Sequence, residues 1–279
     1  MAETSDSYIP LRSVGSGRDA SAVDVGCTRP IPSRRASAPA ISPVELKTAR
    51  YARISGRQPR LVNWLRKTKR VFKPGAQIVN QGERGGRAFI LDQGWTYSSC
   101  TLRSGSRQII DIQIPGDIAN LQGLILPFAM QDVTAITRVE VYEVSFDIVG
   151  GATGPDPELA AFLLWLVASE SAVTSTRLTD LGRRTAIERT AHLILELATR
   201  LKLAGLGTDT GFPCPMTQYL IADALGLTPV HVNRVLRELR LSRLASHHRG
   251  WLNLLDRDKL VVLAQFDGAY LQHPGSLDC

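Results

Sequence analysis

The sequence predicts an α+β protein, in which an N-terminal β domain of the jelly-roll type is followed by one long helix and a small C-terminal helical domain. Between residues 71 and 148, short apolar or alternating runs lie between Gly, Pro and Asp, which is typical of many short strands. From residue 155 onward the apolar residues recur at helical spacing. Two shorter helical segments with capping residues then occupy residues 217–237.

The first 45 residues carry no periodic apolar pattern and are rich in Ser, Pro, Ala, Gly and Arg. Such a segment cannot bury enough apolar surface to offset the entropy of ordering it, so we expect a disordered tail over 1–45. A short amphipathic helical pattern around Leu61, Trp64 and Leu65 belongs to the next predicted domain, 46–154.

Within that domain, glycines recur at turn-like spacing between the apolar runs, which favours a β-sandwich or jelly roll. Jelly rolls also host metal-dependent oxygenases, but those need a histidine cluster, and residues 71–149 contain no histidine. The sequence also shows no Ser-His-Asp arrangement and no phosphate-binding Gly-Lys motif. We therefore expect no enzymatic activity, no metal and no cofactor.

The long helix is predicted over 155–182, opened by Pro155-Asp156-Pro157 and ended by Gly182. It is long enough to form a seam between two chains of a homodimer, and we assign that seam to Leu159, Phe162, Leu166 and Val173. A second apolar register carries Ala161, Leu164, Ala168 and Leu178. The alternative is that one face of the helix packs only on the β domain. A further helix is predicted from about residue 184 to residue 203.

Residues 217–237 carry the pattern of a helix-turn-helix that begins at Gln218. Ala222 stands where the two helices touch, and Gly226 stands where the tight turn favours a left-handed backbone. The remaining diagnostic positions are all apolar: Ile221, Leu225, Leu227, Val232 and Val235. Thr217 and Thr228 are predicted to cap the two helices, and Pro229 fits the first turn of the second.

The second helix exposes Val230, His231, Asn233, Arg234 and Arg237, and in such a motif this face enters the major groove of DNA. Arg234 can donate two hydrogen bonds to guanine, Asn233 can bind adenine or a phosphate, and Val230 can contact a thymine methyl group. Arg237 is expected on the DNA backbone. The alternative is an ordinary helical hairpin with a basic, solvated face.

A turn at residues 246–250 between two short strands has the outline of a wing. His247, His248 and Arg249 are expected near the sugar–phosphate backbone of the DNA. The domain that contains the helix-turn-helix and the wing is predicted over 183–272.

The distribution of charge agrees with a nucleic-acid partner. The chain has a net charge of +7. Residues 228–250 hold five Arg and one Glu, whereas residues 74–155 hold five Lys or Arg and eight Asp or Glu. The four cysteines are widely spaced and no run of eighteen apolar residues occurs. We expect a cytoplasmic protein without a membrane segment.

The chain resembles the Crp/Fnr family of bacterial transcription regulators. The resemblance rests on residues 181–189, 215–218 and 233–236 in the C-terminal part, and on Pro74-Gly75, residues 81–83, Gly94 and residues 115–117 in the β domain. It implies a cyclic-nucleotide-binding-like β domain that senses a signal, a dimerisation helix, and a winged helix-turn-helix that binds an inverted repeat as a homodimer. It also implies RNA polymerase as a further partner.

The sequence departs from two ligand-binding branches of that family. Leu121 stands where cyclic-nucleotide-binding members have Glu, and Ala129-Met130 stand where they have Arg followed by Ser or Thr, which disfavours cAMP binding. Only Cys27 and Cys100 are available for an iron–sulfur cluster that needs four thiolates. Cys214 is either an oxidation-sensitive thiol or a small apolar filler. The alternative function is a cyclic-nucleotide or other small-ligand-binding module whose DNA binding depends on its ligand.

Overall fold

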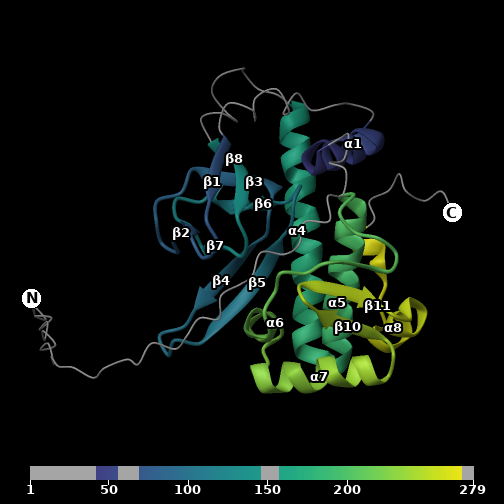
Figure 1. The fold of residues 1–279 in the computed structure, drawn as a ribbon. Coiled ribbons are helices and arrows are strands. Elements are labelled where there is room, and N and C mark those ends of the chain that lie inside the picture. Colours follow the sequence, from purple (N-terminus) through teal and green to yellow (C-terminus); the bar gives the residue numbers. More distant parts are fainter. Residues whose placement is uncertain (1–41, 56–68, 146–156, 272–279) are drawn as a thin grey trace, which may run out of the picture. The chain divides into compact units, whose positions relative to one another are not determined.

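The computed structural model describes residues 42–55, 69–145 and 157–271 (Figure 1). The tail up to residue 41, the helical pattern at Leu61–Leu65 and the cap at Asp156 lie outside the described residues. The helix α1 spans Pro43–Ser55, so the boundary predicted at residue 45 is wrong by a few residues. Ser42 and Glu45 start this helix early, because each accepts a hydrogen bond from the backbone N–H of the other, at 2.9 and 3.2 Å.

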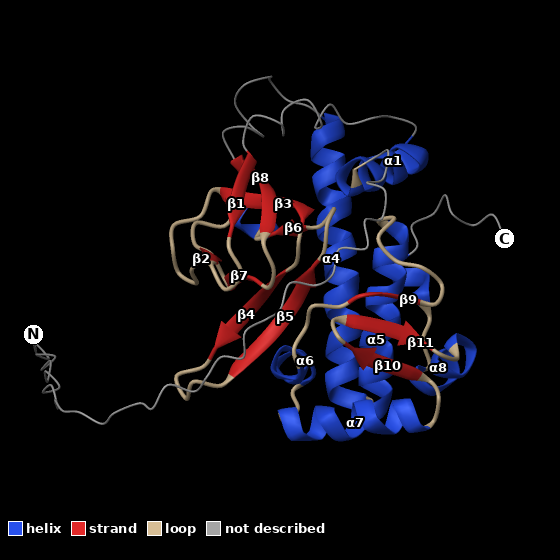
Figure 2. Ribbon diagram, in the orientation of Figure 1, coloured by secondary structure: helices blue, strands red, loops and turns tan. Residues whose placement is uncertain are grey.

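The β domain consists of two four-stranded antiparallel sheets, which agrees with the predicted jelly roll (Figure 2). The first sheet has the order β1-β8-β3-β6 and the second the order β2-β7-β4-β5. The elements are β1 (Lys69–Phe72), β2 (Gln77–Val79), β3 (Arg87–Gln93), β4 (Thr96–Thr101), β5 (Arg107–Gln113), β6 (Ile118–Ala119), the 3-10 helix η1 (Leu121–Leu124), β7 (Asp132–Ala135) and β8 (Val139–Ser145).

Apolar side chains from both sheets form one core of this domain, including Phe89, Leu91, Val133 and Val141. Gly94 makes the tight connection between β3 and β4 at a φ of +86°, and a Cβ there would lie 2.3 Å from the carbonyl oxygen of Arg138. Only glycine fits such a backbone conformation at that distance.

The long helix α4 spans Pro157–Arg183 and α5 spans Ala186–Leu203. The prediction that Gly182 ends α4 is wrong, because Gly182 lies inside the last turn of the helix. The break comes at Thr185, because its side chain caps α5 while Glu188 accepts a hydrogen bond from the N–H of Thr185 at 2.8 Å.

The faces of α4 correct the predicted dimer seam. Phe162 and Leu166 are buried against the chain's own β domain and α1, where Tyr51 packs edge-on against Phe162 at 5.0 Å. These two side chains are therefore not available to a second chain. Leu164 and Leu178, from the second predicted register, are 70% and 71% exposed.

The C-terminal part packs three helices and a three-stranded sheet, order β10-β11-β9, around α5. Its elements are β9 (Gly211–Pro213), α6 (Gln218–Leu225), α7 (Pro229–Leu241), β10 (Ala245–His248), β11 (Trp251–Leu254), α8 (Arg257–Ala264) and the 3-10 helix η2 (Gly268–Leu271). Among the described residues, no helix combines the length and the hydropathy needed to cross a membrane.

Candidate nucleic-acid interface

The helices α6 and α7 form the predicted helix-turn-helix. The Oγ1 of Thr217 accepts from the N–H of Leu220 at 3.3 Å, and the Oγ1 of Thr228 accepts from that of His231 at 3.2 Å. Gly226 has a φ of +60° and Ala222 is 1% exposed. The other diagnostic apolar side chains are buried or, at Leu227, half-buried against the same core. Both helices therefore begin, and α6 ends, where the local sequence signals place them, whereas α7 continues to Leu241, beyond the predicted motif.

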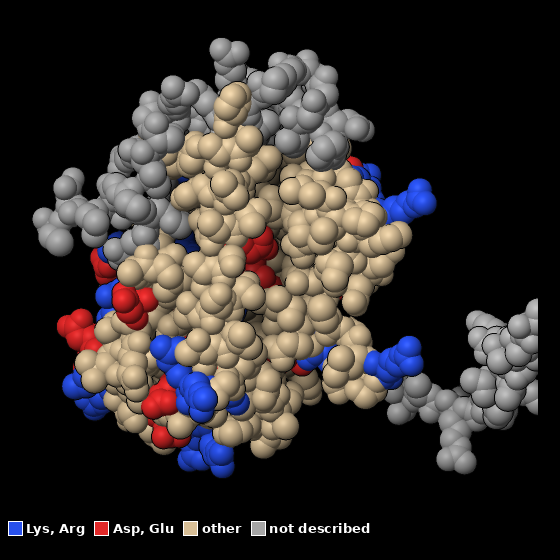
Figure 3. Space-filling view, turned by 180° about the vertical axis from the view of Figure 1, so that it is seen from behind, with Lys and Arg blue, Asp and Glu red and all other residues tan. Residues whose placement is uncertain are grey.

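The solvent-facing side of α7 is polar and basic, apart from Val230 near its start and Leu241 at its end, which are 81% and 69% exposed. Asn233, Arg234 and Arg237 are exposed. The Nη2 of Arg234 lies 3.0 Å from the Nε2 of His231, and the Nδ2 of Asn233 donates to the Oε1 of Gln218 at 3.3 Å. These contacts hold two of the predicted reading side chains in defined positions. On the face shown in Figure 3, Lys and Arg gather mainly in the lower half, the part of the view that contains α7.

The strands β10 and β11 form the predicted wing, joined by Arg249 at a φ of 49° and Gly250 at 73°. Two left-handed residues in a row make the two-residue turn that suits a twisted hairpin. His248 and Arg249 are exposed at its tip. His247 is half-buried, and its Nε2 lies 3.2 Å from the carbonyl oxygen of Cys214, so this ring nitrogen is engaged within the protein.

Cys214 itself is 2% exposed. Burial raises the pKa of its thiol to about 11, because the surroundings disfavour the charged thiolate. Since the thiolate is the reactive form, the structure favours the apolar-filler interpretation of Cys214 over the redox switch.

The β domain contacts the helix-turn-helix directly, through the β4–β5 hairpin. Arg107 on β5 donates to the carboxylate of Asp223 on α6 from Nε and Nη2, at 2.8 and 2.6 Å. The Nη1 of Arg107 also donates to the Oη of Tyr97 at 2.8 Å, and Gln108 donates to the carbonyl oxygen of Ala224 at 3.2 Å. Sequence reasoning missed this contact, because its partners lie 116 residues apart.

A network of buried charges joins α1, β5, α4 and α5. Arg177 on α4 pairs with Asp111 and Glu196, both at 2.7 Å. Arg200 on α5 pairs with Glu196 at 2.8 Å and with Asp117, after β5, at 2.6 Å. These ion pairs connect the β domain to both long helices.

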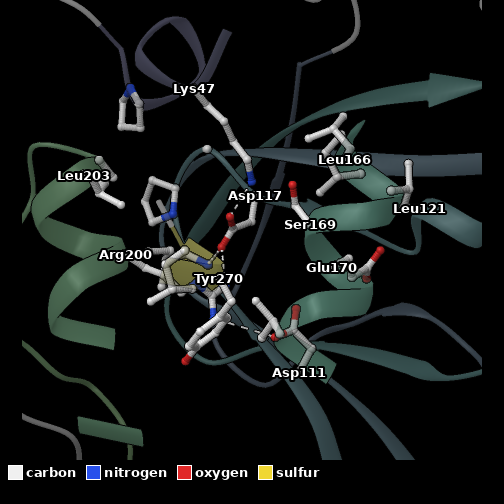
Figure 4. Close-up of a pocket in the computed structure, with 18 residues that line it drawn as sticks. Lys47, Asp111, Asp117, Leu121, Leu166, Ser169, Glu170, Arg200, Leu203 and Tyr270 are labelled. Carbon is white, nitrogen blue, oxygen red and sulfur yellow. Dashed lines mark hydrogen bonds and ion pairs between the residues drawn. The ribbon is translucent and has the colours of Figure 1, made fainter. Parts of the chain in front are cut away.

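Lys47 on α1 completes the network by pairing with Asp117 at 2.7 Å. Figure 4 shows Asp117 between Lys47 and Arg200. Burial alone would raise the pKa of Asp117, but the two cations hold it well below its usual range. Asp117 therefore remains a carboxylate in this buried position.

The junction of α4 and α5 holds a second buried cluster. Asp180 pairs with Arg184, and its Oδ2 lies 2.9 Å from the Nδ1 of His192, which is 1% exposed. Arg184 also donates to the carbonyl oxygen of Ala264, at the end of α8, at 3.1 Å. The ring of His192 also packs against Phe266 and Tyr270, at 5.0 and 6.2 Å between ring centroids, so His192 is a packing residue between helices.

The positions that correspond to the cyclic-phosphate site of the family that the chain resembles are apolar here, and all of them except the exposed Met130 are packed. Leu121 and Leu124 of η1 are buried together with Ala88 and Ile90, and Ala129 is 3% exposed. Residues 118–130 contain no Lys or Arg. This stretch offers neither the carboxylate nor the cation of the known phosphate site.

A jelly-roll β domain joined by a long helix to a winged helix-turn-helix defines a two-domain DNA-binding regulator. Residues 69–149 match the model of the cyclic nucleotide-binding domain, and residues 188–263 match that of the Crp-like helix-turn-helix domain. The chain belongs to the Crp/Fnr family of transcription regulators.

Several relatives are regulators of the same kind. The chain is 26% identical to electron transport regulator A of Shewanella oneidensis, over 70% of this chain and 78% of that protein. It is 29% identical to the nitrogen fixation regulation protein FixK of Azorhizobium caulinodans, over 62% and 68%. The structure of FixK2 from Bradyrhizobium japonicum aligns with a TM-score of 0.64 at 28% identity, covering 70% of this chain and 96% of that one.

Proposed function

We propose that the protein binds an inverted-repeat operator as a homodimer and regulates transcription there without catalysing a reaction. The observation that carries the proposal is the exposed N-terminal half of α7, where Val230, Asn233 and Arg234 face solvent on a buried helix-turn-helix core. In this proposal residues 46–154 form the sensor domain, α4 the dimerisation helix and residues 183–272 the DNA-binding domain.

The proposed contacts divide between bases and backbone. Arg234 donates two hydrogen bonds to a guanine, Asn233 binds an adenine or a phosphate, and Val230 contacts a thymine methyl group. His231 supports Arg234 from one turn earlier on the helix. The proposed backbone contacts come from the two capping residues, from α7 and from the wing: Thr217, Thr228, Arg237, His248 and Arg249.

Arg234→Ala tests the base contact. Operators selected from random oligonucleotides would first give the site, and competition at fixed salt would give the ratio of specific to random DNA affinity. We expect the variant to lose about 1–3 kcal/mol of that discrimination. Arg257→Ala, which removes an exposed charge on α8, is the matched control and should leave the ratio unchanged. An unchanged ratio in Arg234→Ala would refute the assignment.

The dimer seam in this proposal is the outward face of α4, because its exposed side chains recur at intervals of three and four residues. They are Ala160, Leu164, Val167, Ser171, Thr174, Leu178 and Leu181. Of the residues first assigned, Phe162 and Leu166 are buried in the chain, Val173 is half-buried, and the side chain of Leu159 lies outside the described part.

Light scattering tests the seam. Leu164→Glu combined with Leu178→Glu should convert a dimer to a monomer, because like charges would meet across the seam. Val262→Glu is the control, since Val262 is 77% exposed on α8. A dimer that survives the paired substitution would contradict this assignment.

An alternative function is DNA binding that depends on a ligand. One observation supports it, namely the match of the β domain to the cyclic nucleotide-binding domain. The packed positions of Leu121 and Ala129 weigh against cAMP as that ligand. We therefore expect operator binding without cAMP, and a strict requirement for the nucleotide would overturn this view. RNA polymerase is the proposed further partner, and transcription in vitro from a promoter that carries the operator would test it.

A further inference from the structure

A cavity of about 110 Å³ lies among α1, the turn after β5, α4, α5 and η2. It shares only Leu121 with the positions that correspond to a cyclic-phosphate site; Ala129 and Met130 do not line it. The cavity is therefore distinct from the cyclic-phosphate site of cyclic nucleotide-binding domains. Its volume is of the same order as that of a cavity that binds one small molecule such as benzene, roughly 150 Å³.

The charges around this cavity are balanced except at one residue. Two cations, Lys47 and Arg200, line it together with Asp111 and Asp117. Each of these two carboxylates has a cation within 2.7 Å, and the partner of Asp111 is Arg177, which lies behind the cavity wall. Glu170, on α4, also lines the cavity and is half-buried, yet it has no hydrogen bond or ion pair among the described residues. In Figure 4 dashed lines reach Asp117 but none reaches Glu170.

Burial raises the pKa of Glu170 to about 7, and the negative charges of Asp111 and Asp117 add to the effect against Lys47 and Arg200. Glu170 is thus about half ionised at pH 7, and at pH 8 the site lacks nearly one positive charge. Tyr270 also lines the cavity, and its buried Oη has no hydrogen-bond partner among the described residues.

The walls beside Glu170 are apolar. Leu166 and Val173 come from the same helix as Glu170, one turn to either side, and Leu203 lines another part of the cavity from α5. A ligand that suits this cavity carries one positive charge and a short aliphatic part. We propose that the cavity binds a small organic cation of the primary alkylammonium class, whose charged group pairs with Glu170 and whose alkyl chain lies against Leu166 and Val173.

Isothermal titration calorimetry with propylammonium chloride tests the proposal on the full-length protein without DNA, so that its failure is separate from any failure of DNA binding. We expect saturable binding of one cation per chain at pH 8, and no comparable heat from propanol or from sodium chloride at the same ionic strength. Binding at pH 6 should be about tenfold weaker, because a proton must leave Glu170 before the cation can pair with it.

Variants separate this site from general effects of charge. Glu170→Gln should abolish binding at both pH values, whereas Asp258→Asn, which removes an exposed carboxylate on α8, should bind as the wild type does. Val173→Phe keeps Glu170 but fills the apolar side, and it too should abolish binding. The proposal is overturned by equal affinity in Glu170→Gln, by equal binding of propanol, or by no saturable binding at pH 8.

Discussion

Replacing Arg200 with Met would test whether the buried charge network holds the β domain and the helices together. The guanidinium of Arg200 contacts Asp117 at 2.6 Å, Glu196 at 2.8 Å and the carbonyl oxygen of Ile112 at 2.9 Å, and its side chain is 11% exposed. Methionine keeps most of the aliphatic stem and removes only the charge and the hydrogen bonds.

The expected loss of unfolding free energy is about 3 kcal/mol. Removing one partner of a buried ion pair typically costs about 3–5 kcal/mol, because the remaining charge is left uncompensated. Here the lower end applies, since Asp117 keeps Lys47 and Glu196 keeps Arg177, each at 2.7 Å. A loss of this size is a large part of the stability of an ordinary domain.

Urea denaturation followed by circular dichroism measures this loss, which should lower the midpoint by about 1 M. Lys202→Met is the matched control. Lys202 lies on the same helix and pairs with Asp209 at 2.5 Å, but the two side chains are 59% and 71% exposed, so its midpoint should not change. Equal midpoints for Arg200→Met and Lys202→Met would refute the reasoning that burial decides the value of these pairs.

The same variant should unfold at a higher pH on acidification. Asp117 has its pKa lowered in the folded protein, so it contributes stability above its usual pKa, and that stability is lost as the pH falls through the folded value. Without Arg200 the folded pKa moves up, and the loss begins earlier. An acid-unfolding midpoint equal to that of the wild type would contradict the role of Arg200 at this carboxylate.

Three further predictions concern other sites. Glu170→Gln should raise the free energy of unfolding above pH 7 by up to about 3 kcal/mol and leave it unchanged below pH 4.5. The reason is that the raised pKa of Glu170 makes the wild type lose stability as the pH rises between these values. Thermal unfolding at a series of pH values measures the difference. Arg107→Ala should cost less than about 1 kcal/mol of stability yet change operator affinity, since it frees α6 from the β4–β5 hairpin. Fluorescence anisotropy measures that affinity, and an unchanged value would show that the contact does not influence DNA binding. Cys214 should react with a thiol reagent more slowly than the half-buried Cys100, and rapid modification of Cys214 in the native protein would contradict its burial.

The helix-turn-helix could be predicted from the sequence because its signals are local. Thr217, Gly226 and Thr228 each fix one helix end, and the apolar positions follow within twenty residues. The strand β9 was missed because its three residues are too few to show an alternating pattern. The sequence also could not place Phe162 and Leu164, since both registers of α4 are apolar and helical periodicity does not say which face meets the β domain.

The charged residues of the network carry no such local signal. Arg177 meets Asp111 across 66 positions and Arg200 meets Asp117 across 83, so only the folded chain brings them together. Glu170 looks in the sequence like any solvated residue of a helix. Its significance is that, among the described residues, the fold places no ion-pair partner beside it, and no pattern along the chain can show this.

Because α4 has one face packed on the protein and one face exposed, we expect it to tolerate a change in its length less well than a change in its exposed side chains. Adding one residue between Phe162 and Leu178 would rotate everything beyond it by about 100° around the helix axis. The outward stripe would then no longer be continuous, and Arg177 would turn away from Asp111 and Glu196. An insertion of seven residues would restore the angle to within about 20° but would displace the C-terminal half along the axis by about 10 Å. Insertions and deletions in this helix should therefore be tolerated far less well than substitutions on its exposed face.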